Sequence, residues 1–264
     1  MKTVLILNFE APLMSFGGVL VDQLGRTEDF PGLSLVTGLL ANALGWDHAD
    51  AERLQRLQDR LRIASRCDRA GERLLDYHTV DLGDRAEPHA ATNGQPWEVG
   101  SARPLMAIGG WTTRGAREDR EGGLDARYGT HIRYRHYHAD RIQTVAIALE
   151  PPEEEPTLEA FRKALEQPAR PLFIGRKTCL PSCLILADQV QASSLVEALA
   201  QWPRHMRADG GELSAWWPAE EGNGPAMNTV DRPVVDRRDW RNQLVVGRRL
   251  VRHGRISPPA RSNP

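Results

Sequence analysis

The sequence has little lysine, little cysteine and no long apolar run. Only three of its 34 basic residues are Lys, and only three residues are Cys. An odd and small number of cysteines suits a reducing compartment better than a disulfide scaffold. Apolar runs fall short of the roughly 20 residues that a membrane-spanning helix needs, and the stretch from Thr3 to Phe9 is too short for a cleaved signal segment. We therefore expect a soluble, cytoplasmic protein without a membrane partner.

A metal site is not expected from the cysteines or the histidines. Cys179 and Cys183 are separated by three residues that include Pro181, and no second cysteine pair follows. Zinc also accepts histidine, and His136 and His138 are spaced to share one face of a strand. His131 and Asp140 lie near them, but no third ligand has a clear spacing. We expect no metal and no cofactor, and stoichiometric metal in the purified protein would contradict this.

Basic residues are abundant, but they are almost all arginine and unevenly placed. The net charge is −1, while residues 103–141 hold eight Arg against five acids and residues 232–261 hold nine Arg against two. Arginine presents a planar fork of donors that matches phosphate and stacks on bases. Two such stretches can form one local anion-binding face. Two alternatives remain: a codon bias of the genome towards arginine, and a C-terminal Arg-rich segment that contacts an acidic protein.

The first third of the chain predicts strands and helices in a clear order. The apolar run Thr3 to Phe9 predicts a central strand, and Pro12 ends it before Gly17 and Gly18. Helical spacing of apolar residues predicts a helix that Ser34 caps and Gly45 ends. A second helix is expected from about Asp47. Alternation then predicts strands at 61–67 and 73–80, joined as a hairpin through Ala70 and Gly71.

Residues 81–138 have almost no apolar periodicity, and such a long segment within a compact domain is commonly functional. Regular patterns return with a strand at 141–149, a helix capped by Thr157, a strand at 172–180 and a short helix that begins at Ser193 or Ser194. Beyond Pro203 we expect mostly loop, with one strand at 243–251 and a disordered tail from Ser257 to Pro264.

The order of these elements predicts the fold class. A β-α-β-β-α-β succession is typical of an α+β, ferredoxin-like sandwich, the fold that underlies RNA-recognition domains. We accordingly expect a discontinuous core made of residues 1–80 and 139–202. Residues 81–138 are then an insertion into this core, and residues 203–264 are a loop-rich C-terminal extension.

Four segments together resemble the CasD family, which belongs to the RAMP (repeat-associated mysterious protein) superfamily. They are the opening strand with Ala11 to Gly17, the stretch from Phe30 and Pro31 through Ser34 to Leu40, the motif Asp76 to Val80, and the turn Phe173 to Pro181. They occur in the family's order around a long arginine-rich insertion, over most of residues 1–190. One departure is that Gly32 and Leu33 stand where family members often have a hydroxyl and a basic residue. Arg26 is a candidate to supply the missing phosphate contact.

The resemblance implies a non-catalytic RNA-binding subunit of a type I-E Cascade complex in antiviral CRISPR defence. Such a subunit binds the 5′ handle of the guide RNA and caps one end of the backbone-subunit filament. It also contacts the large subunit, so that it meets target DNA only indirectly. The insertion at 81–138 corresponds to a thumb that lies against the guide RNA.

Candidate RNA contacts follow from the residue types in these segments. RNA ends are bound through phosphate contacts and through stacking of splayed bases. In the segment from Arg127 to His138, Arg133 and Arg135 would share one strand face while Tyr134 and His136 share the other. The full set of predicted RNA-binding residues is Met14, Ser15, Gly17, Gly18, Arg26, Ser34, Tyr77, His78, Arg117, Tyr128, His131, Arg133, Arg135, Arg176 and Lys177.

An enzyme is the main alternative, because type I-C relatives of this family cut precursor CRISPR RNA themselves. Metal-independent cleavage needs a general base near the 2′-hydroxyl and a general acid at the leaving oxygen. Suitable residue types are present at Tyr77, His78, His136, His138 and Lys177. No spacing among them requires a catalytic pair, so we expect no catalytic residues.

Overall fold

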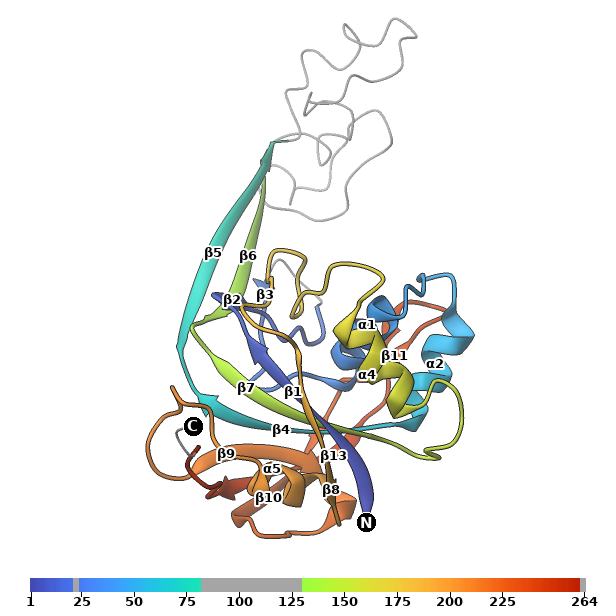
Figure 1. Cartoon of the computed structure of the whole chain (residues 1–264). Helices are drawn as coiled ribbons and strands as arrows, with labels where there is room; N and C mark the ends of the chain where they lie inside the picture. Colours follow the sequence, from blue (N-terminus) through green and yellow to red (C-terminus); the bar gives the residue numbers. More distant parts are fainter. Residues whose placement is uncertain (21–23, 82–129, 262–264) are drawn as a thin grey trace, which may run out of the picture. The chain divides into compact units, whose positions relative to one another are not determined.

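The computed structural model of the protein describes residues 1–20, 24–81 and 130–261 (Figure 1). The chain divides into two compact units. The first comprises Met1–Val19, Thr27–Leu74 and Tyr137–Pro264, and the second comprises Leu20–Arg26 and Leu75–His136. Most of the predicted insertion, residues 82–129, lies outside the described residues.

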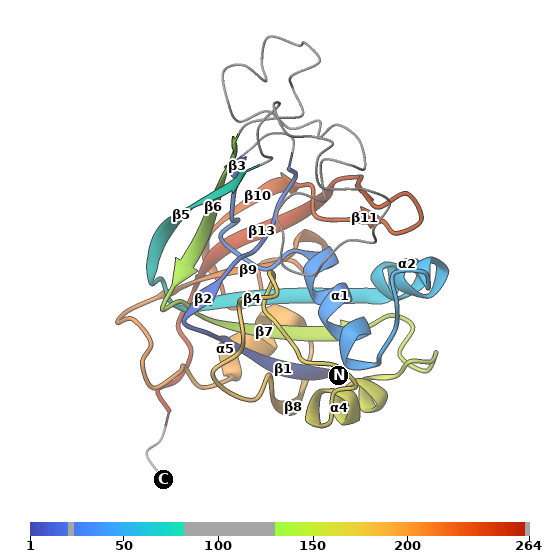
Figure 2. The same cartoon turned by 90° about the horizontal axis from the view of Figure 1, so that it is seen from above.

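A seven-stranded sheet with antiparallel neighbours forms the centre of the first unit (Figures 1 and 2). In spatial order its strands are β10 (Met227–Val234), β13 (Arg249–Ile256), β9 (Leu213–Pro218), β4 (Leu61–Arg69), β7 (Ile142–Leu149), β1 (Lys2–Glu10) and β8 (Leu186–Ala192). With four α-helices among the described residues, the protein is a mixed α/β protein whose sheet is mostly antiparallel.

Strand β1 is buried on both faces, which explains its continuous apolar run. Leu5 and Leu7 belong to one core cluster, whereas Val4 and Ile6 belong to another on the opposite face. Alternate residues of a strand point to opposite sides, so both faces of the sheet are covered here. The predicted central strand is therefore confirmed.

Helices cover the two faces of this part of the sheet. Helices α1 (Leu33–Ala43) and α4 (Leu158–Glu166) pack into the same cluster as Leu5, and α2 (Ala51–Arg60) packs against α1. Helix α5 (Leu195–Gln201) packs on the other face with Val4 and Ile6. Each helix buries one apolar stripe, as its sequence periodicity predicts.

Two predicted helix caps are confirmed and one is wrong. The hydroxyl of Thr157 accepts a hydrogen bond from the amide of Ala160, and that of Ser194 accepts one from Glu197. Ser34 does not cap α1, because the helix already begins at Leu33 after Gly32. Helix α2 also begins later than expected, at Ala51.

The hairpin predicted from residues 61–67 and 73–80 does not form. Both edges of β4 are occupied, by β7 on one side and β9 on the other. Strand β5 (Glu72–Asp81) pairs instead with β6 (Thr130–Ala139). The turn between β4 and β5 is real, since Gly71 has a φ of +62° and lies against the backbone of Ala139. The local alternation of apolar and polar residues predicted the strands correctly. Which strands pair with each other depends on contacts between segments far apart in the chain.

The strand predicted at 172–180 is also wrong. This segment is a loop and turn, in which Gly175 takes a φ of +97°. The strand that pairs with β1 is β8, which lies further along the chain. Strand β8 forms an edge of the sheet and several of its side chains are exposed, so its apolar signal in the sequence is weak.

The chain beyond Pro203 has much more regular structure than expected. It adds β9, β13 and β10 to the main sheet, and Trp217 on β9 is completely buried. It also forms the 3-10 helix η3 (Ala219–Glu221) and a small hairpin of β11 (Arg238–Asp239) and β12 (Leu244–Val245). The predicted strand at 243–251 splits into β12 and β13, because Gly247 takes a φ of +75° between them.

A fully buried ion pair joins α5 to the sheet. Nη2 of Arg66 lies 2.8 Å from Oδ1 of Asp68, and neither side chain is exposed. Arg66 also donates to the carbonyl oxygens of Leu199, Trp202 and Pro203 at the end of α5. Hydrogen bonds of this kind are what a buried charge requires.

Short strands pair with β6 in each unit. In the first unit, β2 (Leu13–Met14) pairs with the end of β6 through Met14 and His138. In the second unit, β3 (Leu24–Gly25) runs parallel to β6, with Leu24 beside Tyr134 and Gly25 beside Arg135.

Candidate nucleic-acid interface

Two of the predicted RNA-contacting segments meet in the first unit. The amide of Ser15 donates to the carbonyl oxygen of Ile174 at 3.3 Å. A Cβ atom placed on Gly175 would lie 1.7 Å from the carbonyl oxygen of Ser15. Only glycine permits this approach, and only glycine adopts this φ without strain. The loop after β1 and the turn with Arg176 and Lys177 therefore form one surface.

The turn with Arg176 and Lys177 is closed by hydrogen bonds within its own backbone. The amide of Ile174 donates to the carbonyl of Cys179 at 2.8 Å, and the amide of Cys179 donates to that of Arg176 at 2.8 Å. Lys177 is exposed, whereas the guanidinium of Arg176 lies 4.5 Å from the ring centre of Tyr137. This cation–π contact holds the guanidinium of Arg176 over the Tyr137 ring, and the exposed Lys177 is the next residue in the chain.

Below this surface lies a buried aromatic and histidine layer. Met14 and Phe16 are fully buried, and the Phe16 ring lies 5.3 Å from that of His138. Nε2 of His138 bonds to the carbonyl oxygen of Glu28 at 2.7 Å. Burial lowers the pKa of His138, so that its neutral form is favoured at neutral pH.

The glycine loop is held by Thr27 and Glu28. The amide of Phe16 donates to the Thr27 hydroxyl at 2.9 Å, and the amide of Glu28 donates to the carbonyl of Phe16 at 2.7 Å. A Cβ on Gly18 would meet the Glu28 carboxylate, whereas none of the described residues has an atom within 4 Å of one on Gly17. The backbone at Gly17 is therefore open to a ligand, in a loop whose shape is fixed by its neighbours.

The second unit contains another group of predicted contacts. The rings of Tyr77 and Tyr134 lie 5.5 Å apart at 59°, across the paired strands β5 and β6. Arg135 and Arg26 are exposed. Arg133 is half-buried and shares the strand face of Arg135 by alternation. Aromatic rings and guanidinium groups thus occur together within this unit.

His78 and Ser34 have polar partners. Nε2 of His78 forms a hydrogen bond with Oδ2 of Asp76. The amide of Leu33 donates to Oδ2 of Asp236 at 2.9 Å, and the amide of Ser34 donates to the Asp236 carbonyl at 3.0 Å. Because Asp236 already occupies these amides, the start of α1 does not offer them to a phosphate.

Three predicted contacts fall outside what the structure describes. Arg117 and Tyr128 lie in the stretch 82–129, and His131 belongs to β6 but its side chain is not described. Conversely, no clear sequence pattern points to Thr27, Tyr137 or Asp236. Alternation along β6 would have placed Tyr137 on the face of Arg135, but its contact with Arg176 depends on a distant loop.

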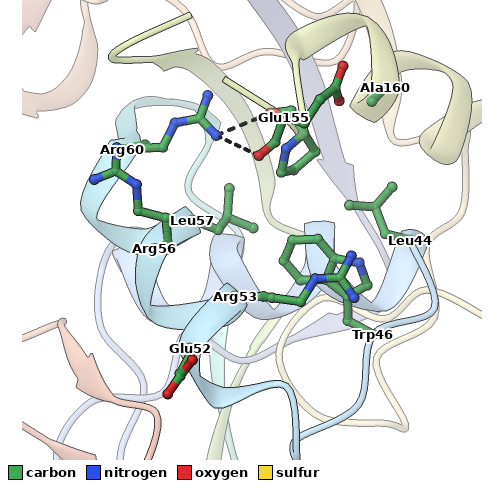
Figure 3. A pocket seen from close by; sticks show the side chains of 10 residues that line it. Leu44, Trp46, Glu52, Arg53, Arg56, Leu57, Arg60, Glu155 and Ala160 are labelled. Atoms are coloured by element: carbon green, nitrogen blue, oxygen red, sulfur yellow. Dashed lines mark hydrogen bonds between the residues drawn. The ribbon is translucent and has the colours of Figure 1, made fainter. Parts of the chain in front are cut away.

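A cavity of about 480 Å³ lies elsewhere in the first unit, between α2 and the segment before α4 (Figure 3). Arg53 lies 4.2 Å from the ring centre of Trp46 there, and the buried Arg60 donates to the carbonyl of Glu155 at 3.3 Å. None of its lining residues is a predicted RNA contact. The cavity therefore does not belong to the candidate interface.

Residues 1–20, 24–81 and 130–261 contain no group of three or more His, Cys, Asp or Glu arranged to hold a metal ion. Within the same residues, no helix combines the length and the apolar character needed to cross a lipid bilayer.

Comparison with known proteins identifies a matching family and a similar protein. Residues 4–252 match the protein family described as CRISPR-associated protein (Cas_Cas5). The chain is 28% identical over 202 residues to the "CRISPR system Cascade subunit CasD" of Escherichia coli (strain K12), which covers 76% of this chain and 78% of that relative.

Two solved structures share its fold. One, titled "CRISPR RNA-guided surveillance complex", has a TM-score of 0.60 at 20% identity and covers 97% of this chain and 91% of the other. The second, titled "Crystal structure of Cas protein", has a TM-score of 0.59 at 24% identity and covers 98% of both chains. The likeness extends over nearly the whole chain.

Proposed function

The chain belongs to the Cas5 family of CRISPR-associated proteins, and from this premise we propose that it is a non-catalytic, RNA-binding subunit of a type I Cascade surveillance complex. It binds the 5′ handle of the guide RNA and joins the backbone filament to the large subunit. Target DNA is met only through the assembled complex. The similarity to a Cascade subunit of Escherichia coli supports this assignment.

The contact between Gly175 and Ser15 is the observation that carries the RNA-binding proposal. It brings the open backbone of the glycine loop and the exposed Lys177 onto one surface. Phosphates are bound by backbone amides of such loops and by lysine or arginine side chains. Arg176, held over Tyr137, adds a second cation to this surface.

The second unit supplies further groups that can contact RNA. Its exposed Arg135 and the paired rings of Tyr77 and Tyr134 combine a phosphate contact with aromatic surface. Single-stranded RNA is held by this combination, because each base has a face that can stack. We propose that β5 and β6 carry this second set of contacts.

We further propose that β8, β1, β7 and β4, with α1 and α4, form a ferredoxin-like RAMP core. The four strands are neighbours in that order, all antiparallel, and the two helices follow β1 and β7 in the chain. This order supports a β-α-β-β-α-β arrangement. Residues 1–80 and 139–202 would then be the core and 81–138 a thumb. Residues 203–264 would extend the same sheet.

The absence of catalysis is part of the proposal, and the burial of one of the five candidate acid–base groups supports it. A general acid or base must reach the substrate, but His138 is buried and bonded to the Glu28 carbonyl. Incubating the purified protein with precursor CRISPR RNA and EDTA tests this point. Specific cutting would establish a metal-independent endoribonuclease and overturn the non-catalytic assignment.

Co-purification tests the binding function. The tagged chain is expressed with its genomic neighbours and a repeat–spacer array, and the retained RNA is sequenced. We expect uniform short RNAs that share one repeat-derived 5′ end, together with other subunits. Retention of neither RNA nor subunits would refute the proposed function.

A further inference from the structure

Three aromatic side chains stack on the part of the sheet that β9, β13 and β10 form (Figure 2). The ring of Trp216 on β9 lies 5.0 Å from that of His253 on β13, with 27° between the ring planes. The ring of Phe30 lies 5.6 Å from that of Trp216 at 17°. We call these three residues the aromatic ladder. All three are only partly buried and none belongs to a core cluster, so the ladder lies at the surface.

The strand register places two arginines on the same face as the ladder. His253 is directly opposite Trp216, so the two side chains share a face of the sheet. Arg255 returns to this face two residues after His253. Arg232 on β10 shares it as well, because it is opposite Val251, which stands two residues before His253. The two arginines therefore flank His253, one in each direction along β13.

This face is buried beneath helices elsewhere in the sheet but reaches the surface here. Ile63 on β4 belongs to the core cluster that α1 and α4 cover. Ser65 shares the face of Ile63 by alternation, and it is opposite Trp216. On the strands beyond β4 the same face carries Arg232 and Arg255, and both side chains are exposed. The ladder and the two arginines are thus accessible to a ligand.

The two arginines bring positive charge that is not neutralised locally. Within the part of the chain that the structure describes, neither Arg232 nor Arg255 forms an ion pair. Arg255 donates from Nη1 to the carbonyl oxygen of Glu212 at 3.3 Å, which leaves its charge uncompensated. Burial lowers the pKa of His253, and the charges of the two arginines lower it further, so that the neutral ring is favoured at neutral pH. A neutral ring with cations on both sides suits a base whose strand carries phosphates.

We propose that the aromatic ladder, Arg232 and Arg255 form a further binding face for a single strand of nucleic acid. A base extends the ladder by stacking on the ring of His253, and the two guanidinium groups bind phosphates of the same strand. Stacking accepts every base, because each base has a flat face. Sheets that carry aromatic rings bind single-stranded RNA in this way. The inference goes beyond the proposed function, since β9, β10 and β13 carry none of the predicted handle contacts.

The test measures the affinity of the full chain for two fluorescein-labelled probes at several salt concentrations, by fluorescence anisotropy. The probes are an oligouridylate and an oligodeoxythymidylate of about 20 nucleotides, longer than the site of one single-strand-binding domain. One variant carries His253→Ala, and another carries Arg232→Ala with Arg255→Ala. Arg252→Ala is the matched control, because Arg252 is next to His253 but points to the opposite face, where it pairs with Asp231.

We expect His253→Ala to weaken binding about tenfold, as for the loss of one stacked base. His253→Phe keeps a ring and should bind nearly as the wild type does. The double arginine variant should lower the slope of log affinity against log salt by about 0.7 for each lost phosphate contact. Arg252→Ala should change neither quantity. Melting temperatures check the fold, and if His253→Ala prevents folding, the arginine variant decides, because it alters only exposed side chains.

Weaker binding of one probe identifies the ligand as RNA or as DNA, and weaker binding of both means that the face accepts either strand; each of these results supports the proposal. Unchanged affinity and slope in both variants, or an equal loss in Arg252→Ala, would overturn it. So would a wild-type chain that binds neither probe. If the variants bind the probes normally but lose a protein subunit from the complex, the face is a protein contact instead. Failure to retain guide RNA and subunits in co-purification would refute the proposed function, and the two probes would still decide this inference.

Discussion

Gly175 lies directly against the backbone of Ser15, although 159 residues separate them in the chain. A Cβ atom on Gly175 would stand 1.7 Å from the Ser15 carbonyl oxygen, and its φ is +97°. The approach joins the loop after β1 to the turn that carries Arg176 and Lys177. Through this contact, two motifs that are far apart in the sequence form one surface.

Replacing Gly175 with alanine should therefore damage both stability and RNA binding. A non-glycine residue in this conformation costs about 1–3 kcal/mol, and the clash with Ser15 is with backbone, which cannot move aside easily. Denaturant unfolding and guide-RNA retention measure the two effects. Gly210→Ala is the control, because no atom of the residues that the structure describes lies within 4 Å of a Cβ there. Equal stability of the two variants would contradict the structure of this site.

Lys177→Ala should weaken RNA binding without changing stability. Lys177 is exposed at the turn, and loss of one phosphate contact is expected to lower the slope of log affinity against log salt by about 1. Titration of the guide RNA at several salt concentrations measures the slope. Lys163→Ala, on the exposed face of α4, is the matched control and should leave it unchanged. An unaltered slope for Lys177→Ala would remove this lysine from the interface.

Arg133→Ala combined with Arg135→Ala should weaken guide binding while the protein stays folded. Both residues lie on one face of β6, and Arg135 is exposed. Each lost phosphate contact weakens binding similarly for all RNA sequences. Affinity and melting temperature are measured together. If the melting temperature falls sharply and the affinity holds, the two arginines are structural.

Asp68→Ala should be among the most destabilising single substitutions. It leaves the guanidinium of Arg66 buried without its carboxylate, and removes the acceptor for the amide of His205. Breaking one partner of a buried ion pair costs about 3–5 kcal/mol. Chemical denaturation measures the loss. The control is Asp231→Ala, which breaks an exposed pair with Arg252 and should have a much smaller effect. Similar losses for both would show that burial of the Arg66–Asp68 pair is unimportant.

His138 should make the protein less stable at mildly acidic pH. Burial lowers the pKa of His138 in the folded state, whereas the unfolded chain has the ordinary value near 6.5. The unfolded chain therefore binds the proton first as the pH falls. Stability is full above about 6.5 and declines as the pH falls from there towards the lowered pKa of the folded state.

The matched variant His138→Gln keeps a hydrogen-bond donor for the Glu28 carbonyl but does not titrate. Melting temperatures at pH 7.5 and 5.5 should differ less for this variant than for the wild type. His253, whose pKa is also lowered by burial, contributes in the same direction to both proteins. If the melting temperature falls by the same amount between pH 7.5 and 5.5 in the wild type and in His138→Gln, His138 is excluded as a source of the pH dependence.

The candidate site was only partly accessible to sequence reasoning. Gly17, Arg176 and Lys177 stand out because glycine and cations have distinctive local chemistry. Tyr137 and Thr27 were missed, since their roles depend on the segments that they contact. Asp236 was missed for the same reason: it binds the amides that begin α1 from about 200 positions away along the chain.

Strands and helices can be predicted from the sequence wherever one face or both faces are strongly apolar, as in β1, β7, α4 and α5. Those patterns are local, because burial stabilises an apolar face wherever the segment packs. Tertiary structure alone decided that β4 pairs with β7 and β9, that β8 rather than residues 172–180 joins β1, and that Gly175 meets Ser15. These outcomes depend on hydrogen bonds and close packing between distant segments, and no local pattern encodes which distant partner a strand edge or a glycine will meet.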